Sequence, residues 1–366
     1  MMQAGMSIIR VALDVPIATL FDYRAPDATT ADVGRRVLVP FGRKTAVGVI
    51  VELAHSTAVP VERLKNAIRI LDEFPPLAAE DLRLLRFAAD YYHHPLGAVV
   101  MGALPTRLRR LAASARSRER RSYFLTPAGS ALAEAALSPR ASAQRRLLER
   151  LRQGPLGHGE AGTTFRQGRS TLKRFMERGW VKLHEEKPAV STAPVETTAA
   201  PALTPEQAQA VSEICARLGG FHPFLLLGVT SSGKTEIYLH AIAATLEAGR
   251  QALVLVPEIA LTPQLEALVQ HRFPGTHKVS LHSGLTEAER LEHWRAACSG
   301  RARIVLGTRL AVFAPLPELG LIVVDEEQDS SFKQGEGFRY SARDLAVVRA
   351  RQRGVPVVLA SATPAL

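Results

Sequence analysis

The chain has 366 residues, which at about 150 residues per domain predicts two or three domains. Hydrophobic residues make up 46% of the chain and charged residues 22%, a globular balance that excludes a wholly disordered or fibrous protein. The formal net charge of +11 favours a polyanion partner, most simply nucleic acid. The alternative is a compositional bias, because arginine and alanine are both abundant and a GC-rich coding sequence would produce that pairing anyway.

The sequence carries no sign of a membrane or secreted location. No run of about 18 apolar residues occurs, as a membrane-spanning helix would need. The start of the chain has no basic patch followed by a long apolar core and a cleavage site. Two cysteines, Cys215 and Cys298, are too few for a disulfide scaffold or a cysteine-rich zinc site. We therefore expect a cytoplasmic protein with no membrane partner.

Residues 1–105 are predicted to form a small β-rich domain with one helix. Arg36–Phe41 and Thr45–Leu53 are rich in valine and isoleucine and are separated by a Gly-Arg-Lys turn, a pattern typical of strand, turn, strand. Glu80–His94 has apolar residues at helical spacing and is closed by proline and glycine, which predicts a helix.

Residues 106–184 are predicted to form a basic linker followed by a small helical module. Residues 106–122 are dense in arginine, as a solvated linker would be. Ser142–Arg152 and Ser170–Gly179 have helical patterns, and a strand follows the second, which is compatible with a helix-turn-helix or winged-helix module. Residues 185–202 lack periodicity and are rich in proline, threonine and alanine, so they are predicted to be a linker.

Residues 203–366 alternate short apolar strands with helical stretches. This alternation predicts a buried, mostly parallel sheet with helices on its faces. The fold class expected for the whole chain is therefore multidomain α/β, with a small β-rich domain, a winged-helix-like module and a parallel-sheet domain.

Residues 228–235 fit the phosphate-binding pattern G-x-x-x-x-G-K-[ST], here called the P-loop. A predicted strand, Phe224–Leu227, precedes it, and a predicted helix, Glu236–Glu247, follows it. Glycines let the backbone turn its N–H groups toward phosphate oxygens. Lys234 is expected to reach the β- and γ-phosphates, and the Thr235 hydroxyl to bind Mg²⁺. The predicted nucleotide-binding residues are Gly228, Val229, Thr230, Ser231, Ser232, Gly233, Lys234 and Thr235.

An acidic run, residues 325–328, ends the apolar strand before it. Ligands of α/β folds bind at the carboxyl edge of the sheet, where this run is expected to lie. Asp325 is predicted to hold Mg²⁺, and Glu326 to orient and deprotonate the attacking water. By itself the run would equally fit a charged loop, but the P-loop in the same predicted sheet favours catalysis.

Two weaker features complete the predicted site. Ser361, Ala362 and Thr363 follow the predicted strand Pro356–Ala360, where they would couple hydrolysis to strand movement, although small polar residues after a strand are common. Gln207 is placed to read the adenine edge through its amide, and the alternative is an ordinary glutamine on a helix surface.

Long uninterrupted segments of the sequence resemble the PriA family, the primosomal replication-restart helicases of superfamily 2. The segments are FDY at 21–23, VPFGRK at 39–44, ADYYHHPLG at 89–97, GVTSSGKTEIYL at 228–239, VVDEEQDSSFKQGEGFRYSARDLAVVRA at 323–350 and LASATPAL at 359–366. The resemblance covers essentially the whole chain. It implies a RecA-like helicase lobe in residues 203–366, preceded by a winged-helix domain and a domain that binds DNA 3′ ends.

The resemblance also implies an activity and partners. A member of this family is expected to be an ATP-dependent 3′-to-5′ DNA helicase that recognises stalled forks and initiates primosome assembly. ATP and Mg²⁺ are the implied cofactors. The implied partners are forked DNA, single-stranded DNA, primosome proteins and the single-stranded DNA-binding protein.

Two sets of DNA-binding residues follow from the resemblance. Phe21, Asp22, Gly42 and Lys65 match the pocket for the DNA 3′ end, although the residues alone predict Phe21 to be core and Asp22 to be a turn residue. Residues 329–340 match the family's aromatic-rich loop, which senses single-stranded DNA. The predicted stacking and charged residues of this loop are Phe332, Lys333, Phe338, Arg339 and Tyr340.

The sequence departs from the family pattern in three places. Gln328 replaces the usual histidine, which puts in doubt how tightly hydrolysis is coupled to DNA, and Ser231 replaces a usual glycine. The chain also stops where the family's second helicase lobe, zinc-binding cysteines and C-terminal domain would follow. We therefore expect the N-terminal half of a helicase that is inactive alone, and the alternative is a non-catalytic module that binds forked DNA and ATP.

Overall fold

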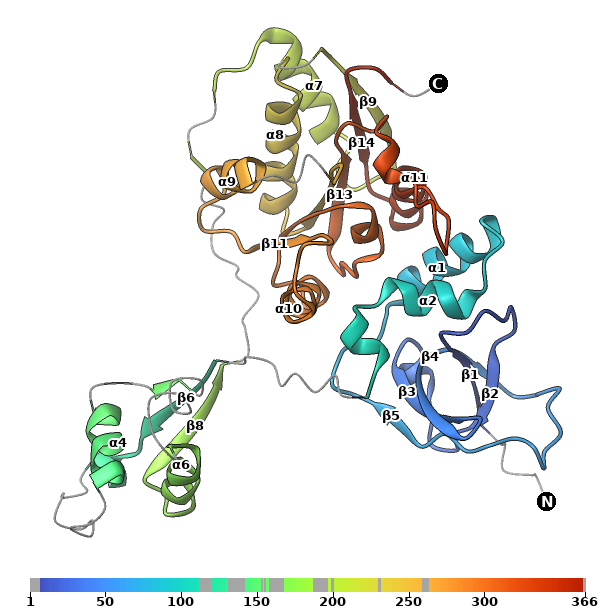
Figure 1. Ribbon diagram of the computed structural model, residues 1–366. Helices are drawn as coiled ribbons and strands as arrows, with labels where there is room; N and C mark the ends of the chain where they lie inside the picture. The colour runs from blue at the N-terminus through green and yellow to red at the C-terminus, as the bar shows by residue number, and fades with distance from the viewer. Residues whose placement is uncertain are drawn as a thin grey trace. The chain divides into compact units, whose positions relative to one another are not determined.

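The computed structural model describes residues 7–111, 120–130, 142–152, 154, 156–157, 168–186, 197–198, 201–229, 232–258 and 263–364. The chain divides into two compact units. Unit 1 consists of Met1–Ala115 with Val190–Leu366, and unit 2 consists of Arg116–Ala189 (Figure 1). Within the described ranges, no helix is both long enough and apolar enough to cross a membrane.

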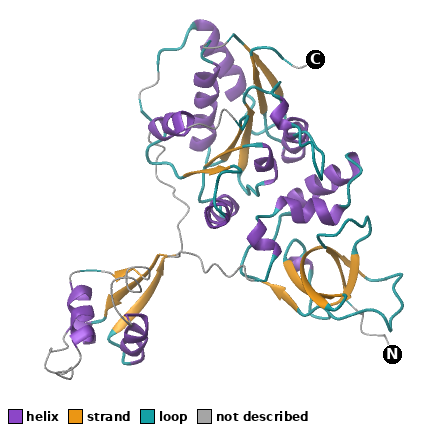
Figure 2. Ribbon diagram, viewed as in Figure 1, coloured by secondary structure: helices purple, strands orange, loops and turns teal. Residues whose placement is uncertain are grey.

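The N-terminal part of unit 1 is a rolled antiparallel sheet with the strand order β2-β1-β4-β3-β5 (Figure 2). Its strands are β1 (Ile8–Ala12), β2 (Phe21–Arg24), β3 (Arg36–Phe41), β4 (Lys44–Ala54) and β5 (Arg69–Leu71). The segment before β5 connects the two sides of the roll. The Arg24 N–H donates to the Lys65 carbonyl at 2.9 Å, and the Ile68 N–H donates to the Leu38 carbonyl at 2.9 Å. The predicted strand-turn-strand unit is present as β3 and β4.

Two short helices, α1 (Ala79–Tyr91) and α2 (Leu96–Ala103), follow the rolled sheet. The single helix predicted for residues 80–94 ends at Tyr91 instead. His93 adopts a left-handed conformation with φ +51°, and Pro95 disfavours helical geometry in the residue before it. The chain therefore turns between α1 and α2.

The C-terminal part of unit 1 is a six-stranded parallel sheet with the strand order β11-β12-β10-β13-β14-β9. Its strands are β9 (Pro223–Leu227), β10 (Gln251–Leu255), β11 (Lys278–Leu281), β12 (Ile304–Gly307), β13 (Leu319–Val324) and β14 (Val357–Ser361). Its helices are α7 (Pro205–Cys215), α8 (Lys234–Glu247), α9 (Pro263–Arg272), α10 (Glu287–Cys298) and α11 (Ala342–Arg353), with 3-10 turns η4 (Arg309–Phe313) and η5 (Ser330–Phe332). This sheet and the rolled sheet confirm the predicted α/β fold class.

The two faces of the parallel sheet are covered by different helices. Val254 belongs to a buried cluster with Ile242 of α8, whereas Leu253 belongs to a cluster with Leu345 of α11. Successive residues of a strand point to opposite faces, so β10 lies between two apolar layers. This double burial explains why its sequence is a continuous apolar run.

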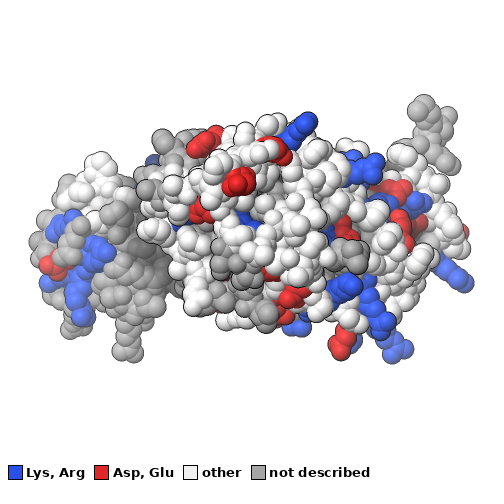
Figure 3. All heavy atoms as spheres, turned by 90° about the horizontal axis from the view of Figure 1, so that it is seen from above, with Lys and Arg blue, Asp and Glu red and all other residues white. Residues whose placement is uncertain are grey.

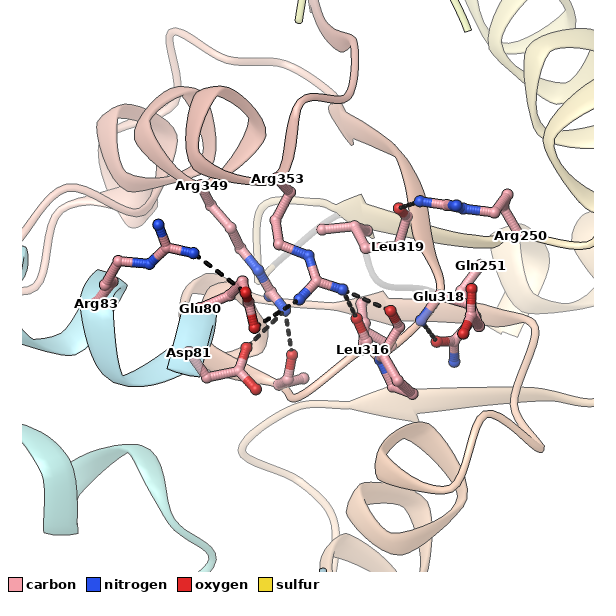
Figure 4. Close-up of polar contacts among 12 residues, drawn as sticks. Glu80, Asp81, Arg83, Arg250, Gln251, Leu316, Glu318, Leu319, Arg349 and Arg353 are labelled. Atoms are coloured by element: carbon pink, nitrogen blue, oxygen red, sulfur yellow. Dashed lines mark hydrogen bonds and ion pairs between the residues drawn. The ribbon is translucent and has the colours of Figure 1, made fainter. Parts of the chain in front are cut away.

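The helices of the N-terminal part pack against the parallel-sheet part (Figure 4). Asp81 of α1 forms an ion pair with Arg349 of α11 at 3.6 Å, and Glu80 forms one with Arg353 at 3.8 Å. Arg349 is buried and also donates to the carbonyls of Val312 and Ala314 at 2.7 and 2.6 Å.

The described residues of unit 2 form a three-stranded antiparallel sheet, ordered β7-β6-β8, together with helices. Its elements are β6 (Arg120–Leu125), α3 (Pro127–Ser130), α4 (Ser142–Arg152), β7 (Leu156–Gly157), α6 (Gly168–Glu177) and β8 (Val181–Glu186). Its core includes Leu147, Leu151 and Phe175. The predicted helices of this region are present as α4 and α6. Residues 112–119 and 187–196 of the predicted linkers lie outside the described residues, and the predicted domain boundaries stay predictions.

Candidate nucleotide and DNA sites

The P-loop leaves β9 at the carboxyl edge of the parallel sheet. Gly233 begins α8 with φ +84°, a conformation that favours glycine, and a Cβ atom there would lie 2.3 Å from the side-chain nitrogen of Gln207, which would have to move. The Lys234 ammonium is mostly buried and donates to the carbonyls of Gly228 and Val229 at 2.6 and 3.1 Å. Those bonds hold its charge over the loop in which the sequence predicts phosphates. Thr230 and Ser231 lie outside the described residues.

Asp325 follows β13, close to the P-loop. The strand order β13-β14-β9 and a bond from the Gly228 N–H to the Ser361 carbonyl, 3.1 Å long, bring the two loops to one edge. The Tyr238 hydroxyl donates to Oδ2 of Asp325 at 3.0 Å, and the Glu326 N–H donates to Oδ1 at 3.1 Å. Burial raises the pKa of Asp325, and the Tyr238 hydrogen bond and the Lys234 charge oppose that rise.

A continuous chain of hydrogen bonds connects Glu326 to the segment after β14. The Gln328 side-chain NH₂ donates to Oε2 of Glu326 at 2.7 Å, and the Ser361 hydroxyl donates to the Gln328 carbonyl oxygen at 2.5 Å. The Thr363 N–H in turn donates to the Ser361 hydroxyl at 3.1 Å, so Ala362 lies between two members of the chain. An amide supplies one donor and one acceptor together without gaining or losing a proton. Gln328 therefore bridges Glu326 and Ser361 in a single protonation state.

Glu326 has a left-handed backbone with φ +47°, which is uncommon for a residue other than glycine. Residues held in such conformations cost roughly 1–3 kcal/mol each and cluster at functional sites. The bond from Gln328 fixes the direction of the Glu326 carboxylate.

Gln207 lies between the N-terminus of α7 and the P-loop, and its contact with adenine stays a prediction. Its side-chain oxygen accepts from the Thr204 N–H at 2.9 Å, and its side-chain nitrogen donates to the Ser232 carbonyl at 2.9 Å. Both ends of the amide are therefore engaged within the protein, one in the N-terminal cap of α7 and one on the P-loop. In this structure Gln207 positions the P-loop and does not present a free amide to a base.

Two residues of the site were missed by the sequence analysis. Tyr238 lies on α8 one turn after Lys234, where the pattern resembles an ordinary buried position. Glu327 is buried and forms an ion pair with Arg343 of α11 at 3.1 Å, and its N–H donates to the Ala360 carbonyl at 3.0 Å. Its position inside the acidic run was the only available signal.

The four residues predicted to hold a DNA 3′ end lie around β2. The Phe21 ring is edge-on to the Phe41 ring with centroids 5.3 Å apart, and Gly42 follows Phe41 with φ +59° and open space around its Cα. Asp22 lies in a strand and not in the turn predicted from the residues alone, and it pairs with Arg10 at 3.5 Å. Lys65 is exposed, and its carbonyl is bonded to β2 at Arg24.

The aromatic-rich loop, residues 329–340, is only partly exposed in this structure. Phe332 and Tyr340 are 2% and 5% exposed, and their stacking on DNA stays a prediction. Phe338 is half-buried and stacks on Tyr340 with centroids 4.8 Å apart. Burial of large aromatic rings contributes strongly to stability. The burial of Tyr340 against Phe313 therefore holds the loop against η4. Lys333 and Arg339 remain exposed.

Charged residues of both signs lie on the face of the molecule shown in Figure 3. On the face shown in Figure 3, lysine and arginine side chains are interspersed with aspartate and glutamate side chains. The net charge of +11 is therefore not concentrated in one continuous basic patch on that face.

Comparison with known proteins identifies both parts of unit 1. Residues 10–105 match the 3′ DNA-binding domain (3′BD) of PriA, and residues 204–365 match the DEAD/DEAH box helicase family. The replication restart protein PriA of Haemophilus influenzae is 39% identical over 370 residues, which cover 99% of this chain and 50% of that protein. The corresponding protein of Treponema pallidum is 32% identical over 364 residues, which cover 98% of this chain and 44% of that protein.

The chain is similar to PriA replication restart proteins over nearly its whole length. This confirms the resemblance found in the sequence, and the chain spans about half the length of the curated PriA relatives it matches. A solved structure of RecG bound to a three-way DNA junction is also similar, with 22% identity and a TM-score of 0.36 over 47% of this chain and 24% of that chain.

The match to the DEAD/DEAH box helicase family implies the use of ATP and Mg²⁺. Among the described residues, no group of three or more His, Cys, Asp or Glu side chains is placed to hold a metal ion. Mg²⁺ in nucleotide sites needs no such group, because it uses one or two carboxylates together with phosphates and water. Asp325 and Thr235 fit that requirement. The zinc site implied for the full-length PriA family stays a prediction.

Acidification should weaken ATP·Mg²⁺ binding, and the midpoint of this loss should lie at a higher pH than the pKa of an ordinary aspartate. A metal ligand must be deprotonated, and burial raises the pKa of Asp325, so protons compete for it earlier in an acid titration. Tyr238→Phe should move the midpoint to still higher pH, because the hydroxyl stabilises the charged carboxylate. Calorimetric titrations between about pH 4 and 7 measure the midpoint, with Mg²⁺-free ATP as the control. If Tyr238→Phe had the same midpoint as the wild-type chain, the assignment of Asp325 as the group that titrates would be contradicted.

Proposed function

We propose that this chain is the ATP-binding and DNA-binding part of a replication-restart helicase that acts on forked DNA. The observation that carries the proposal is the hydrogen-bonded chain from Glu326 through Gln328 and Ser361 to Thr363, at the same sheet edge as the P-loop. These hydrogen bonds connect the proposed water-activating carboxylate of Glu326 to the end of β14. A displacement of either end would therefore alter the hydrogen bonds of the other.

The residues of the P-loop edge have distinct proposed roles. Lys234 exchanges its bonds to the Gly228 and Val229 carbonyls for bonds to phosphate oxygens. Thr235 and Asp325 hold Mg²⁺, which when bound neutralises charge on the phosphates. Glu326 takes a proton from the attacking water, since its carboxylate is already oriented by Gln328.

The proposed DNA contacts lie in both parts of unit 1. Phe21, Asp22, Gly42 and Lys65 bind the 3′ end of a strand at a fork, and Lys333, Arg339 and Phe338 contact single-stranded DNA. The match of residues 10–105 to the 3′ DNA-binding domain supports the first contact. Translocation from 3′ to 5′ and the assembly of primosome proteins with the single-stranded DNA-binding protein belong to the same proposal.

The proposal predicts that ATP·Mg²⁺ and forked DNA change each other's affinity for this chain. A fork ending in a 3′-hydroxyl should shift the Kd of ATP·Mg²⁺ by roughly 5- to 150-fold, the usual range for coupled sites. By thermodynamic linkage, ATP·Mg²⁺ should shift the Kd of the fork by the same factor. Fluorescence titrations of each ligand, with and without saturation by the other, measure both factors.

The 3′ end provides the control for this titration. An ionised Asp22 accepts a hydrogen bond from a 3′-hydroxyl and repels a 3′-phosphate. Charge-assisted hydrogen bonds contribute roughly 1.5–3 kcal/mol, so the hydroxyl fork should bind about 10- to 150-fold more tightly. Asp22→Ala should erase that preference, whereas Lys65→Ala should weaken both forks alike. No coupling in the wild-type chain, or equal affinity for the two forks, would contradict the proposal.

A further inference from the structure

The turn after α1 contacts the aromatic-rich loop from the N-terminal side of unit 1. The Tyr92 hydroxyl accepts a hydrogen bond from the Ser341 N–H at 3.2 Å, and Ser341 caps the N-terminus of α11. The Phe338 ring lies 6.1 Å from the Tyr92 ring and 5.2 Å from the His94 ring, centroid to centroid. Tyr92 and His94 therefore hold both the end of the loop and its half-buried aromatic residue.

The same end of α11 is bonded to the acidic run. Arg343, two residues after Ser341, forms the ion pair with buried Glu327 at 3.1 Å. Glu327 directly follows Glu326, and its N–H is bonded to Ala360 in β14. Only the first turn of α11 separates the Tyr92 contact from the proposed water-activating carboxylate.

The helix that carries Tyr92 cannot shift independently of α11. Asp81 and Glu80, in the first turn of α1, form the ion pairs with Arg349 and Arg353 in the last two turns of α11 (Figure 4). Tyr92 follows the last residue of α1 and contacts the first turn of α11. The two helices are therefore joined at both ends, and movement of the loop is resisted at Tyr92.

The turn itself is shaped for this contact. His93 adopts φ +51°, a conformation in which histidine is more common than most side chains but which still carries strain. The left-handed residue reverses the chain between Tyr92 and His94, so that both rings reach Phe338. Packing between the two parts of unit 1 would not by itself require a strained residue at His93, between the two rings that contact Phe338.

We infer that Tyr92 is a positioning residue that makes the aromatic-rich loop and the acidic strand end respond together to single-stranded DNA. Its hydroxyl fixes Ser341, and its ring and that of His94 fix Phe338. Displacement of the loop by a DNA strand then pulls on α11 and, through Arg343, on Glu327. The inference rests on the proposed function, because it concerns coupling between the nucleotide and DNA sites of that function.

Tyr92→Phe tests the inference because it retains the ring and removes only the acceptor for Ser341. The affinities for ATP·Mg²⁺ alone and for single-stranded DNA alone should be unchanged. The factor by which each ligand shifts the other's Kd should fall to within about 2-fold of unity, against the roughly 5- to 150-fold usual for coupled sites. Hydrogen exchange should report the local change, with the Ser341 amide exchanging at least about tenfold faster.

Tyr91→Phe is the matched control, since Tyr91 is the preceding tyrosine and is 63% exposed. It should retain the wild-type coupling factor and the slow exchange at Ser341. Wild-type coupling in Tyr92→Phe, or an equal loss in both variants, would overturn the inference while leaving the proposed function standing. An absence of coupling in the wild-type chain would instead contradict the proposed function and, with it, the inference.

Discussion

Arg349→Leu should destabilise unit 1 by about 3–5 kcal/mol, the usual result of removing one partner of a buried ion pair. Arg349 is 2% exposed and lies 3.6 Å from Asp81, and the substitution would leave this buried carboxyl group without the cation that favours its charged form. The carbonyls of Val312 and Ala314 would also lose their donors. Burial lowers the pKa of Arg349 to about 10, so the guanidinium is charged at neutral pH and its removal uncovers a real charge. Urea unfolding followed by circular dichroism measures the difference.

The double variant Asp81→Leu/Arg349→Leu separates the buried charge from the lost packing. It should be more stable than Arg349→Leu alone, because no uncompensated charge remains, whereas independent sites would give additive losses. Arg83→Leu is the surface control. Arg83 is 59% exposed and pairs with Glu80 at 3.1 Å on the same helix, so its loss should cost less than about 1 kcal/mol. If Arg349→Leu also lost less than about 1 kcal/mol of stability, the Arg349–Asp81 ion pair would not stabilise unit 1 as expected.

The P-loop and the acidic run could be located from sequence because each is a continuous string attached to one strand. A strand, a glycine-rich loop and a helix in succession place Lys234 and Thr235 with no knowledge of the rest of the chain. The end of β13 places Asp325 in the same way, since parallel strands end at a common edge. The family resemblance then extended the prediction to residues such as Phe21, whose local sequence indicates only core.

The contacts that position these groups could not be predicted, because they join residues far apart in the chain. Tyr92 and Ser341 are separated by 249 residues and Tyr238 and Asp325 by 87, and neither pair leaves a periodic pattern. The residue type of Gln207 indicates an amide that can bind a base, but it does not indicate that the two ends of the amide contact Thr204 and Ser232. The sequence of the aromatic-rich loop likewise does not indicate which of its rings are buried in the core.

Lys234→Ala should weaken ATP·Mg²⁺ binding by at least about 10- to 150-fold, the contribution of one charge-assisted hydrogen bond of roughly 1.5–3 kcal/mol. Lys234 is 7% exposed as a residue, and its ammonium lies within hydrogen-bond distance of the Gly228 and Val229 carbonyls, so it is held at the loop before any ligand arrives. Phosphate oxygens carry negative charge and are stronger acceptors than those carbonyls. Removing the ammonium therefore takes away both a hydrogen-bond donor and a positive charge at a site that is partly shielded from water. Isothermal titration calorimetry with ATP·Mg²⁺ measures the loss.

Lys333→Ala is the matched control for this loss, because it removes the same charge from an exposed position in the aromatic-rich loop. Its ATP·Mg²⁺ affinity should equal that of the wild-type chain, while its affinity for single-stranded DNA should fall and become less dependent on salt. Lys234→Ala should show the reverse, with DNA affinity retained and nucleotide affinity lost. Both variants need unchanged thermal melting for the comparison to hold. Unchanged ATP·Mg²⁺ affinity in a folded Lys234→Ala variant would remove the P-loop from the nucleotide site.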